Sequence, residues 1–496
     1  MNFRIIAKVL GILIILIGVA MSACAIFSEI EVRHSVEESG PAAKSAVTAL
    51  WAGTGISVFF GLALFLFGFR CKNDILRREA IVIVGLSWIL AAGFGAIPFY
   101  LCDPGLGMVE SYFESMSGIT TTGSTVMEDI EAYPRGVLLW RSTLQWLGGI
   151  GIVVLFAAVL SFLGVGSRSL MQQESSLNIS DSNASRVSDI ALMLLKIYLI
   201  FSVVCTVGLI VLGMSTFDAV LHAMTTVSTG GFSPKNASVG HFDSIPIEIW
   251  ISIFMILGSL SFMLYVFIVQ RKWKRVASEE EGKFYLILLV IVCAAIALDL
   301  FLATDDHTFG QAFHESFFNV ISISSTTGFA VSDYDQWPLF SRMLLIFLMV
   351  VGGCAGSTAG GVKMNRVILF KRIARMELTR TFRPHQVFKI TLNGVAPDRK
   401  VLVTATLFLA LALIIILISS LLIALLEPDL NLISVFGCSF ATLFNTGPGF
   451  ESVGPTDNFA FLNDGTLALL SLLMVIGRLE FFAILVLFMP SLWKKY

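Results

Sequence analysis

The chain has 496 residues, of which 56% are hydrophobic and 14% are charged, and its formal net charge is −2. A soluble domain carries about 25% charged residues, so this composition excludes an ordinary soluble protein. We expect an all-α membrane protein without a nucleic-acid partner.

Apolar runs long enough to cross a hydrocarbon layer, on the order of 20 residues each, recur along the whole chain. The first contains Ala23-Cys24-Ala25 but is longer than the apolar core of a signal peptide, so we expect a retained anchor. We predict about ten transmembrane helices. The runs lie near 9–27, 46–68, 80–101, 137–163, 190–213, 247–269, 284–303, 340–351 continuing past an interruption to about 370, 400–426 and 466–489.

Charged residues alternate in sign from one connection to the next. By the positive-inside rule, the basic connections and both termini are expected to be cytoplasmic, and the acidic connections to face outward. The basic set is Arg70, Lys72, Arg77, Arg78, Arg271, Lys272, Lys274, Arg275, Lys494 and Lys495. The acidic set includes Glu37, Glu38, Glu128, Asp129, Glu131, Asp305, Asp306, Asp333, Asp335, Glu451, Asp457 and Asp464.

Four short turns that end in Thr-Gly recur about every hundred residues on the acidic side. Glycine allows backbone dihedrals that turn a carbonyl toward an axis, and rings of carbonyls can replace the water shell of a cation. The pattern therefore predicts a K⁺ selectivity filter built within one chain. Aligned on Thr-Gly, the candidate filter residues are Thr121, Thr122, Gly123, Ser228, Thr229, Gly230, Thr326, Thr327, Gly328, Asn445, Thr446 and Gly447.

Each turn follows an apolar segment too short to span the bilayer, which is typical of a re-entrant helix. These segments are 108–119, 216–226, 310–323 and 431–443. We expect four helix, re-entrant loop, helix units around a pseudo-fourfold pore, with the C-terminal, partly negative ends of the short helices favouring a cation. The predicted division is an N-terminal two-helix hairpin at 1–78 and pore repeats at 79–188, 189–282, 283–398 and 399–496.

A glycine-rich stretch, residues 352–361, interrupts the second spanning helix of the third unit. Five glycines in ten residues disfavour a helix by about 1 kcal/mol each relative to alanine. We expect an irregular intramembrane loop that acts as a gate; the alternative is close helix packing through small residues. The candidate gate residues are Gly356, Ser357, Thr358, Ala359, Gly360 and, from the last spanning run, Arg478.

Arg478 and Glu480 interrupt the last apolar run. An arginine at mid-membrane costs about 2.5–3.5 kcal/mol, so it should face the bundle or the pore. The two residues lie on different sides of a helix and each requires its own partner.

The basic segment from Lys363 to Lys389 continues from the glycine-rich stretch. One interpretation is topology alone, with positive residues kept inside the cell. The other is a docking surface for a cytosolic partner, which would then have a direct mechanical connection to the gate.

The turns, the glycine-rich stretch and the Gly477-Arg478-Leu479-Glu480 segment, taken in order, resemble the Trk/Ktr/HKT superfamily of potassium transporters, and most closely its bacterial TrkH branch. The resemblance implies potassium uptake across the bacterial inner membrane, a homodimer of complete pores, and control by a cytosolic TrkA-like ring of nucleotide-binding subunits. It also implies that the glycine-rich loop blocks the pore and that Arg478 helps to hold it shut. Gly123, where sodium-admitting plant relatives have serine, implies potassium preference.

The alternative function is a coupled secondary transporter carrying K⁺ with H⁺ or Na⁺. Such a protein predicts two related halves and carboxylates near the helix breaks, whereas the sequence has four units and few such acids. An enzyme is disfavoured because the sequence lacks a histidine pair, metal-ligand spacing or a catalytic triad. We expect no bound cofactor, with K⁺ as substrate held only at the filter residues.

Overall fold

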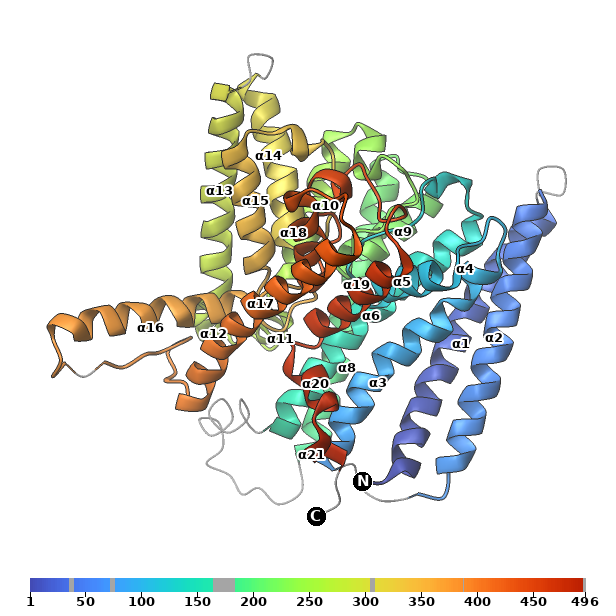
Figure 1. Cartoon of the computed structure of the whole chain (residues 1–496), viewed down its shortest axis with the longest axis horizontal. Coiled ribbons are helices and arrows are strands. Elements are labelled where there is room, and N and C mark those ends of the chain that lie inside the picture. Colours follow the sequence, from blue (N-terminus) through green and yellow to red (C-terminus); the bar gives the residue numbers. More distant parts are fainter. Residues whose placement is uncertain (35–39, 72–75, 164–182, 304–307, 387, 494–496) are drawn as a thin grey trace.

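The computed structural model describes residues 1–34, 40–71, 76–163, 183–303, 308–386 and 388–493. In this part of the chain the regular structure is helical, apart from one isolated bridge between Leu392 and Val395. The predicted all-α class is therefore confirmed (Figure 1). Of the charged residues used to predict sidedness, Glu37, Glu38, Lys72, Asp305, Asp306, Lys494 and Lys495 lie outside the described residues.

Six helical segments within the described residues are long and apolar enough to cross a membrane, and a bent pair makes a possible seventh. Five of them are α1 (Phe3–His34), α2 (Pro41–Gly68), α8 (Asn183–Val211), α13 (Glu281–Ala303) and α17 (Arg399–Leu426), and the sixth combines α3 (Arg77–Gly95) with α4 (Ile97–Leu101). The predicted run 137–163 corresponds to α6 (Arg135–Leu163). The other predicted runs are broken into shorter helices.

The N-terminal hairpin is formed by α1 and α2, which run side by side (Figure 1). A Cβ atom at Gly11 would lie within 3.0 Å of the Gly61 backbone, so only glycine permits this spacing. Close backbone approach through small residues is the usual way in which apolar helices associate without water to drive them together.

The predicted run 247–269 is not one helix. It forms α10 (Ile245–Ser259) and α11 (Phe262–Val269), which meet at an angle of 90°. No glycine or proline lies at the break, which occupies Leu260 and Ser261. The cause is a contact with another part of the chain, described below.

Four short helices occupy the positions predicted for re-entrant segments, within one residue at either end. They are α5 (Met108–Ile119), α9 (Thr216–Val227), α14 (Phe309–Ser324) and α18 (Leu432–Leu443). Each ends directly before one of the four turns. Ser215, Thr308 and Asn431 cap α9, α14 and α18 by accepting a backbone N–H at the start of the helix, as expected for these residue types.

Two further helices end where the sequence predicts interruptions. α15 (Leu339–Val351) stops at Gly352, whose φ of 65° is favourable for glycine, and α19 (Asp464–Arg478) stops at Arg478. After the glycine-rich stretch, α16 (Met364–Phe382) extends away from the helical bundle (Figure 1). Within the described residues, the remaining short α-helices are α12 (Trp273–Ser278), α20 (Phe482–Leu485) and α21 (Pro490–Trp493), and five 3₁₀ helices of three to five residues also occur.

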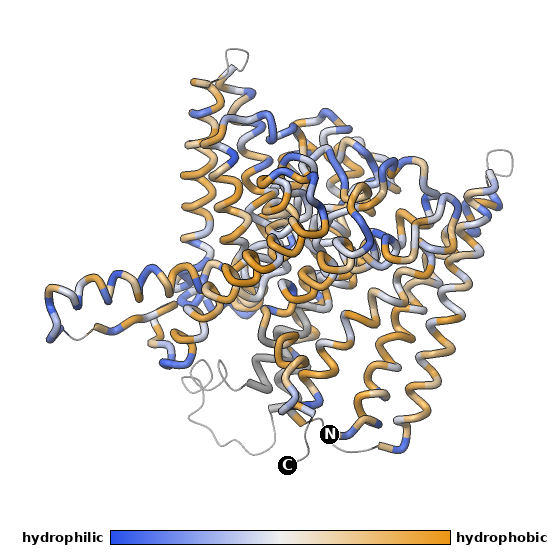
Figure 2. The backbone as a smooth tube through the Cα atoms, in the orientation of Figure 1, coloured by the Kyte–Doolittle hydropathy of each residue, from blue (hydrophilic) through white to orange (hydrophobic). Residues whose placement is uncertain are grey.

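Polar loops gather at one end of the molecule and polar residues also lie on α16 and around α12 toward the other end, with apolar helices between them (Figure 2). The start of α1 and the short α21 lie together at the opposite end, where Ile5 and Leu492 share a small apolar cluster. The first three residues of the first, third and fourth turns, and Ser228 and Thr229 of the second, are buried. Two large apolar clusters surround them, one joining the hairpin with the first and fourth units and the other joining the second and third units.

Candidate functional site

All four short helices end in the same backbone conformation. We number the turn residues 1 to 4: Thr120–Gly123, Ser228–Gly231, Ser325–Gly328 and Phe444–Gly447. In each turn the N–H of residue 3 donates to the carbonyl five residues earlier, and the N–H of residue 2 donates to the carbonyl three residues earlier. These paired bonds form the Schellman motif, which satisfies the last carbonyls of a helix.

Residue 2 of every turn is left-handed although none is glycine. The φ angles are 54° at Thr121, 53° at Thr229, 56° at Thr326 and 52° at Asn445. A β-branched residue in this region is a conformational outlier, and such strain costs about 1–3 kcal/mol at each of the three threonines, whereas asparagine tolerates the region. The same left-handed conformation at four separate places in one chain indicates a shared function for the turns.

The conformation corrects the alignment of the second turn. Residue 4 has positive φ in every turn: 93° at Gly123, 76° at Gly231, 80° at Gly328 and 98° at Gly447. Alignment on Thr-Gly had matched Gly230 to this position, but Gly231 occupies it and Gly230 is residue 3. Ser228 and Thr229 remain in the turn, one position earlier than predicted.

The four turns close into a ring. A Cβ atom placed on residue 4 of any turn would lie within 3.0 Å of the carbonyl oxygen of residue 3 in the next turn. Gly123 faces Gly230 in this way, and Gly447 of the fourth turn faces Thr122 of the first. The Asn445 side chain also donates to Thr122 Oγ1 at 2.8 Å. This closure requires glycine at residue 4 and confirms the predicted fourfold arrangement.

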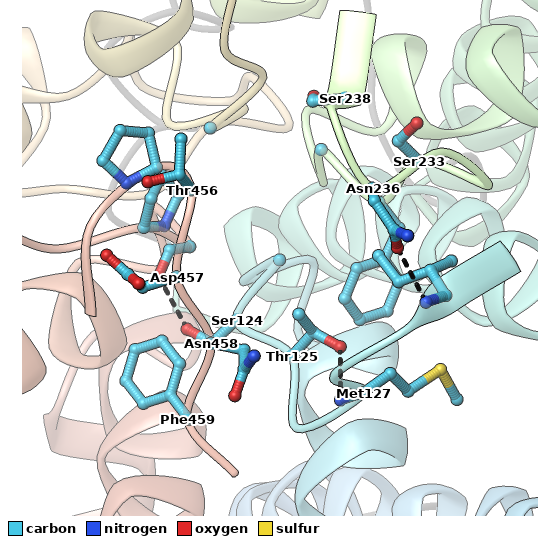
Figure 3. Close-up of a pocket in the computed structure, with 18 of the residues that line it drawn as sticks. Ser124, Thr125, Met127, Ser233, Asn236, Ser238, Thr456, Asp457, Asn458 and Phe459 are labelled. Atoms are coloured by element: carbon cyan, nitrogen blue, oxygen red, sulfur yellow. Dashed lines mark hydrogen bonds between the residues drawn. The ribbon is translucent and has the colours of Figure 1, made fainter. Parts of the chain in front are cut away.

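A cavity of about 120 Å³ opens onto this ring, and all four residue-4 glycines line it. Figure 3 shows side chains of the segments after the first two turns, including Thr125 and Ser233, together with Asp457 and Asn458. The residues that line the cavity include Glu128 and Asp457 but also Arg141 and Lys235. The acidic mouth predicted from the loops therefore includes basic groups as well.

The loops after the third and fourth turns are joined at their outer side. Asp335 accepts a hydrogen bond from the Glu451 N–H at 3.0 Å, and Arg342 pairs with the Glu451 carboxylate at 3.1 Å. Burial raises the pKa of the Asp335 carboxyl to about 6. Tyr334 donates to the Gly449 carbonyl at 3.1 Å. These contacts hold the two loops in one arrangement above the ring.

A buried ion pair supports the first two turns. Arg141 Nε lies 2.5 Å from Glu114 Oε1, with the two side chains 3% and 0% exposed. Glu114 also accepts from the Val126 N–H at 3.0 Å, and Arg141 donates to the Ser233 carbonyl at 3.0 Å. A buried pair is costly unless its remaining hydrogen-bonding groups are satisfied. Here they are satisfied by the backbone after the two turns.

The glycine-rich loop fits into the break between α10 and α11. Its Cys354 N–H donates to the Ser259 carbonyl at 2.9 Å, and the Phe262 N–H donates to the Gly356 carbonyl at 3.0 Å. Groups that a continuous helix would pair internally are thus paired with the loop. A helix can break within the membrane when neighbouring segments satisfy its freed backbone groups.

The same loop contacts the inner side of three turns. The Thr358 hydroxyl donates to the Val227 carbonyl at 3.2 Å, beneath the second turn. The Gly360 N–H donates to Thr326 Oγ1 at 2.6 Å in the third turn. The Gly361 N–H donates to the Phe444 carbonyl at 3.1 Å in the fourth. The predicted gate residues 356–360 therefore lie directly against the predicted filter.

Arg478 and Glu480 each have their own partner, as predicted. Arg478 is 4% exposed, and its Nη1 donates to the Thr358 carbonyl at 2.7 Å. Its Nε and Nη2 atoms are buried without a hydrogen-bond partner. Glu480 forms an ion pair with Arg366 at the start of α16. Arg478 is thus a positive charge attached to the loop beneath the ring.

Comparisons with known proteins place this architecture in a family. A family model described as TrkH, cation transport protein, matches residues 57–495. The chain belongs to the TrkH family. Two potassium uptake proteins named TrkH are similar over their full lengths: that of Vibrio parahaemolyticus is 33% identical over 100% of both chains, and that of Escherichia coli K12 is 32% identical over the same share. The crystal structure of the Vibrio parahaemolyticus potassium transporter TrkH superposes with a TM-score of 0.87 at 30% identity, over 100% of both chains.

The TrkH proteins to which this chain is similar are transport proteins rather than enzymes. Within the described residues, no group of three or more His, Cys, Asp or Glu side chains is arranged to hold a metal ion. The chemistry available at the ring is that of backbone carbonyls and hydroxyls. Such oxygen ligands suit the weak, exchangeable binding of an alkali cation that is transported.

Most of the basic segment predicted from Lys363 to Lys389 forms α16, which ends at Phe382 and has an exposed C-terminal half. Arg372 forms an ion pair with Glu280 at 2.6 Å, and Arg380 forms one with Glu377 on the same helix at 2.9 Å. Arg375, Arg380 and Arg383 are exposed. α16 starts three residues after the glycine-rich stretch, so its position and that of the loop are coupled by a short connection.

Besides the buried pair of Glu114 and Arg141, sequence reasoning missed two features of this TrkH-family site. The first is Gly231. The Thr-Gly pattern ends at Gly230, so alignment on that pattern assigned the turn position to Gly230 instead of Gly231. The second is the break at Leu260 and Ser261, for which the local sequence carries no signal. A hydrogen-bonding loop elsewhere in the chain produces that break, and such a partner becomes visible only in three dimensions.

Proposed function

We propose that this protein takes up potassium across the bacterial inner membrane through a channel-like pore. The observation that carries the proposal is the closed ring of four turns, in which each residue 4 faces a carbonyl of the next turn and all four glycines line one cavity. The relatives named above as potassium uptake proteins support K⁺ as the substrate. No resident cofactor takes part in this mechanism.

In this proposal the ring acts as the selectivity filter. Carbonyl oxygens of the turn residues replace the water molecules of a bare cation, and the C-terminal ends of α5, α9, α14 and α18 contribute partial negative charge around it. The filter comprises residues 2 to 4 of each turn, with Gly231 added to the predicted residues. An anion would be repelled by the same helix ends.

The glycine-rich loop is proposed as the gate, closed in the present arrangement. It lies beneath the turns and is fastened to them, to the α10 and α11 break and to Arg478. Opening of the gate requires the hydrogen bonds that hold the loop to break together. Irregular backbone without bulky side chains suits such a movement, because glycine adopts many conformations at little cost.

The chain organisation fits this mechanism. We propose the hairpin 1–78 as a peripheral element and 79–188, 189–282, 283–398 and 399–496 as the four pore repeats, each of which contributes one short helix and one turn. The termini are assigned to the cytoplasm from the positive-inside rule. A homodimer of complete pores is proposed by family resemblance.

The experiment that tests the function is radioactive rubidium flux into liposomes containing the purified protein. A channel passes rubidium down its gradient without a second ion, whereas the alternative, a coupled transporter, requires H⁺ or Na⁺ on one side. We expect flux that is driven by the rubidium gradient alone and is reduced by excess K⁺ more than by excess Na⁺. Flux that depends strictly on a Na⁺ or H⁺ gradient would replace the channel proposal with the coupled transporter.

α16 is proposed as the docking surface for the cytosolic TrkA-like ring. Reversing the charge of Arg375, Arg380 and Arg383 to glutamate should weaken assembly at least about tenfold in a salt-sensitive way, and remove nucleotide control without altering ion selectivity. Co-purification and nucleotide-dependent flux measure both effects. Reversal of the exposed Arg399 and Lys400 at the start of α17 is the matched control. If the triple variant assembles and responds to nucleotide normally, the basic residues serve topology alone.

A further inference from the structure

The second turn differs from the other three at residue 3. The first, third and fourth turns have a threonine there, at Thr122, Thr327 and Thr446, whereas the second has Gly230. The backbone at Gly230 is not left-handed, so its conformation is not the reason for glycine. The surroundings are the reason: a Cβ atom on Gly230 would lie within 3.0 Å of the Cδ, Oε1 and Nε2 atoms of Gln145.

Gln145 thus occupies the space that a threonine side chain fills in the other turns. It extends from α6, is fully buried, and comes from the unit before the one whose turn it contacts. Its Nε2 donates to the Gly230 carbonyl at 2.6 Å, and its Oε1 accepts from the Phe232 N–H at 3.1 Å. The side-chain amide of Gln145 is therefore hydrogen-bonded to the backbone on both sides of Gly231.

The second turn needs such a restraint more than the others. Two consecutive glycines, Gly230 and Gly231, have more backbone freedom than a threonine followed by glycine. Threonine is β-branched and stiff, so residue 3 restrains the other three turns from within. Gln145 supplies the restraint from outside, and Arg141, one helical turn earlier on α6, holds the Ser233 carbonyl at 3.0 Å.

We propose that Gln145 is a positioning residue for the ion-binding ring: it replaces the missing threonine of the second turn and fixes the Gly230 and Gly231 carbonyls for selection of potassium over sodium. This inference rests on the proposed filter function. Discrimination between two cations of equal charge depends on where the oxygen ligands are held. Loosening one of four turns should therefore lower selectivity while ions still pass.

Gln145→Ala is expected to lower the K⁺ to Na⁺ permeability ratio about fivefold to tenfold, with rubidium flux retained. The ratio is obtained from the reversal potential in mixed K⁺ and Na⁺. Gln145→Met, which keeps the side-chain volume and removes the amide, is expected to lower the ratio similarly and serves if the alanine variant does not fold. Thr143→Val is the matched control, because Thr143 lies on the same helix but contacts Cys24 and Leu139 rather than a turn.

The decisive experiment exchanges the two restraints. Gly230→Thr alone should impair selectivity and flux, since its side chain would collide with Gln145. In the Gln145→Ala background the same threonine has space, and the double variant should recover most of the permeability ratio. A residue needed only for folding would not show this reciprocal rescue.

The outcomes separate the inference from the function on which it rests. Loss of selectivity in Gln145→Ala with recovery in the double variant supports the positioning role. An unchanged ratio in both Gln145 variants, or a lowered ratio that Gly230→Thr does not restore, overturns it. If Gly123→Ser, which changes another turn, still alters the ratio in that case, the filter proposal stands; if it does not, the filter proposal fails as well.

Discussion

Replacing Gly123 by serine is expected to lower the K⁺ to Na⁺ permeability ratio by about tenfold or more, and to lower total rubidium flux by less. Gly123 has a φ of 93°, which side chains rarely adopt, and a Cβ atom there would lie within 3.0 Å of the Gly230 carbonyl oxygen. The first and second turns must then move apart. A tenfold change corresponds to about 1.4 kcal/mol, within the cost of displacing one strained backbone segment.

Reversal potentials in mixed K⁺ and Na⁺ measure this ratio, and rubidium uptake measures flux. Gly213→Ser is the matched control: Gly213 has a φ of 99°, close to that of Gly123, but nothing lies within 4 Å of its added Cβ atom. It incurs the same backbone strain away from the ring and should leave selectivity unchanged. Equal reversal potentials in Gly123→Ser and the unmodified protein would show that Gly123 does not shape the filter.

The short helices could be predicted from sequence because length and hydropathy determine them locally. Each is an apolar segment of 12 to 16 residues that ends at a turn, and such segments are too short to span a membrane. The glycine-rich break was predictable for a similar reason, since helix propensity is a local property. The prediction of one continuous helix over 247–269 is wrong, because the break in this segment depends on hydrogen bonds to Cys354 and Gly356, about a hundred residues away.

The ring residues were predicted with one error of register. Thr-Gly is a pattern of two residues, and where Gly230 and Gly231 stand together the pattern selects the first glycine. In the structure the second glycine, Gly231, is the equivalent of Gly123. Thr229 is the left-handed residue 2 of this turn, which makes Gly231 residue 4. The contact of Gln145 with the second turn could not be predicted, since a lone glutamine in an apolar helix carries no spacing signal.

Replacing Arg478 by alanine is expected to raise basal rubidium flux in the absence of any cytosolic partner. The change removes the hydrogen bond from Nη1 to the Thr358 carbonyl, 2.7 Å long, and a positive charge beneath the ring. A hydrogen bond to a charged group contributes about 1.5–3 kcal/mol, which corresponds to roughly 10-fold to 150-fold in the ratio of open to closed gates. Two of the three guanidinium nitrogens are buried without a partner, and their removal relieves a desolvation cost, so we expect the increase in flux at the lower end of this range.

Two further variants separate the charge from the attachment of the loop. Arg478→Gln keeps a hydrogen-bond donor but removes the positive charge, so flux near the basal level would assign closure to the hydrogen bond and increased flux would assign it to the charge. Thr358→Val keeps the carbonyl that Arg478 contacts and removes the hydroxyl that donates to Val227 and Gly258. It should raise flux less than Arg478→Ala. Normal or reduced basal flux in a correctly inserted Arg478→Ala protein would contradict a gating role, because the loop would then remain closed through its contacts with α10, α11 and the turns alone.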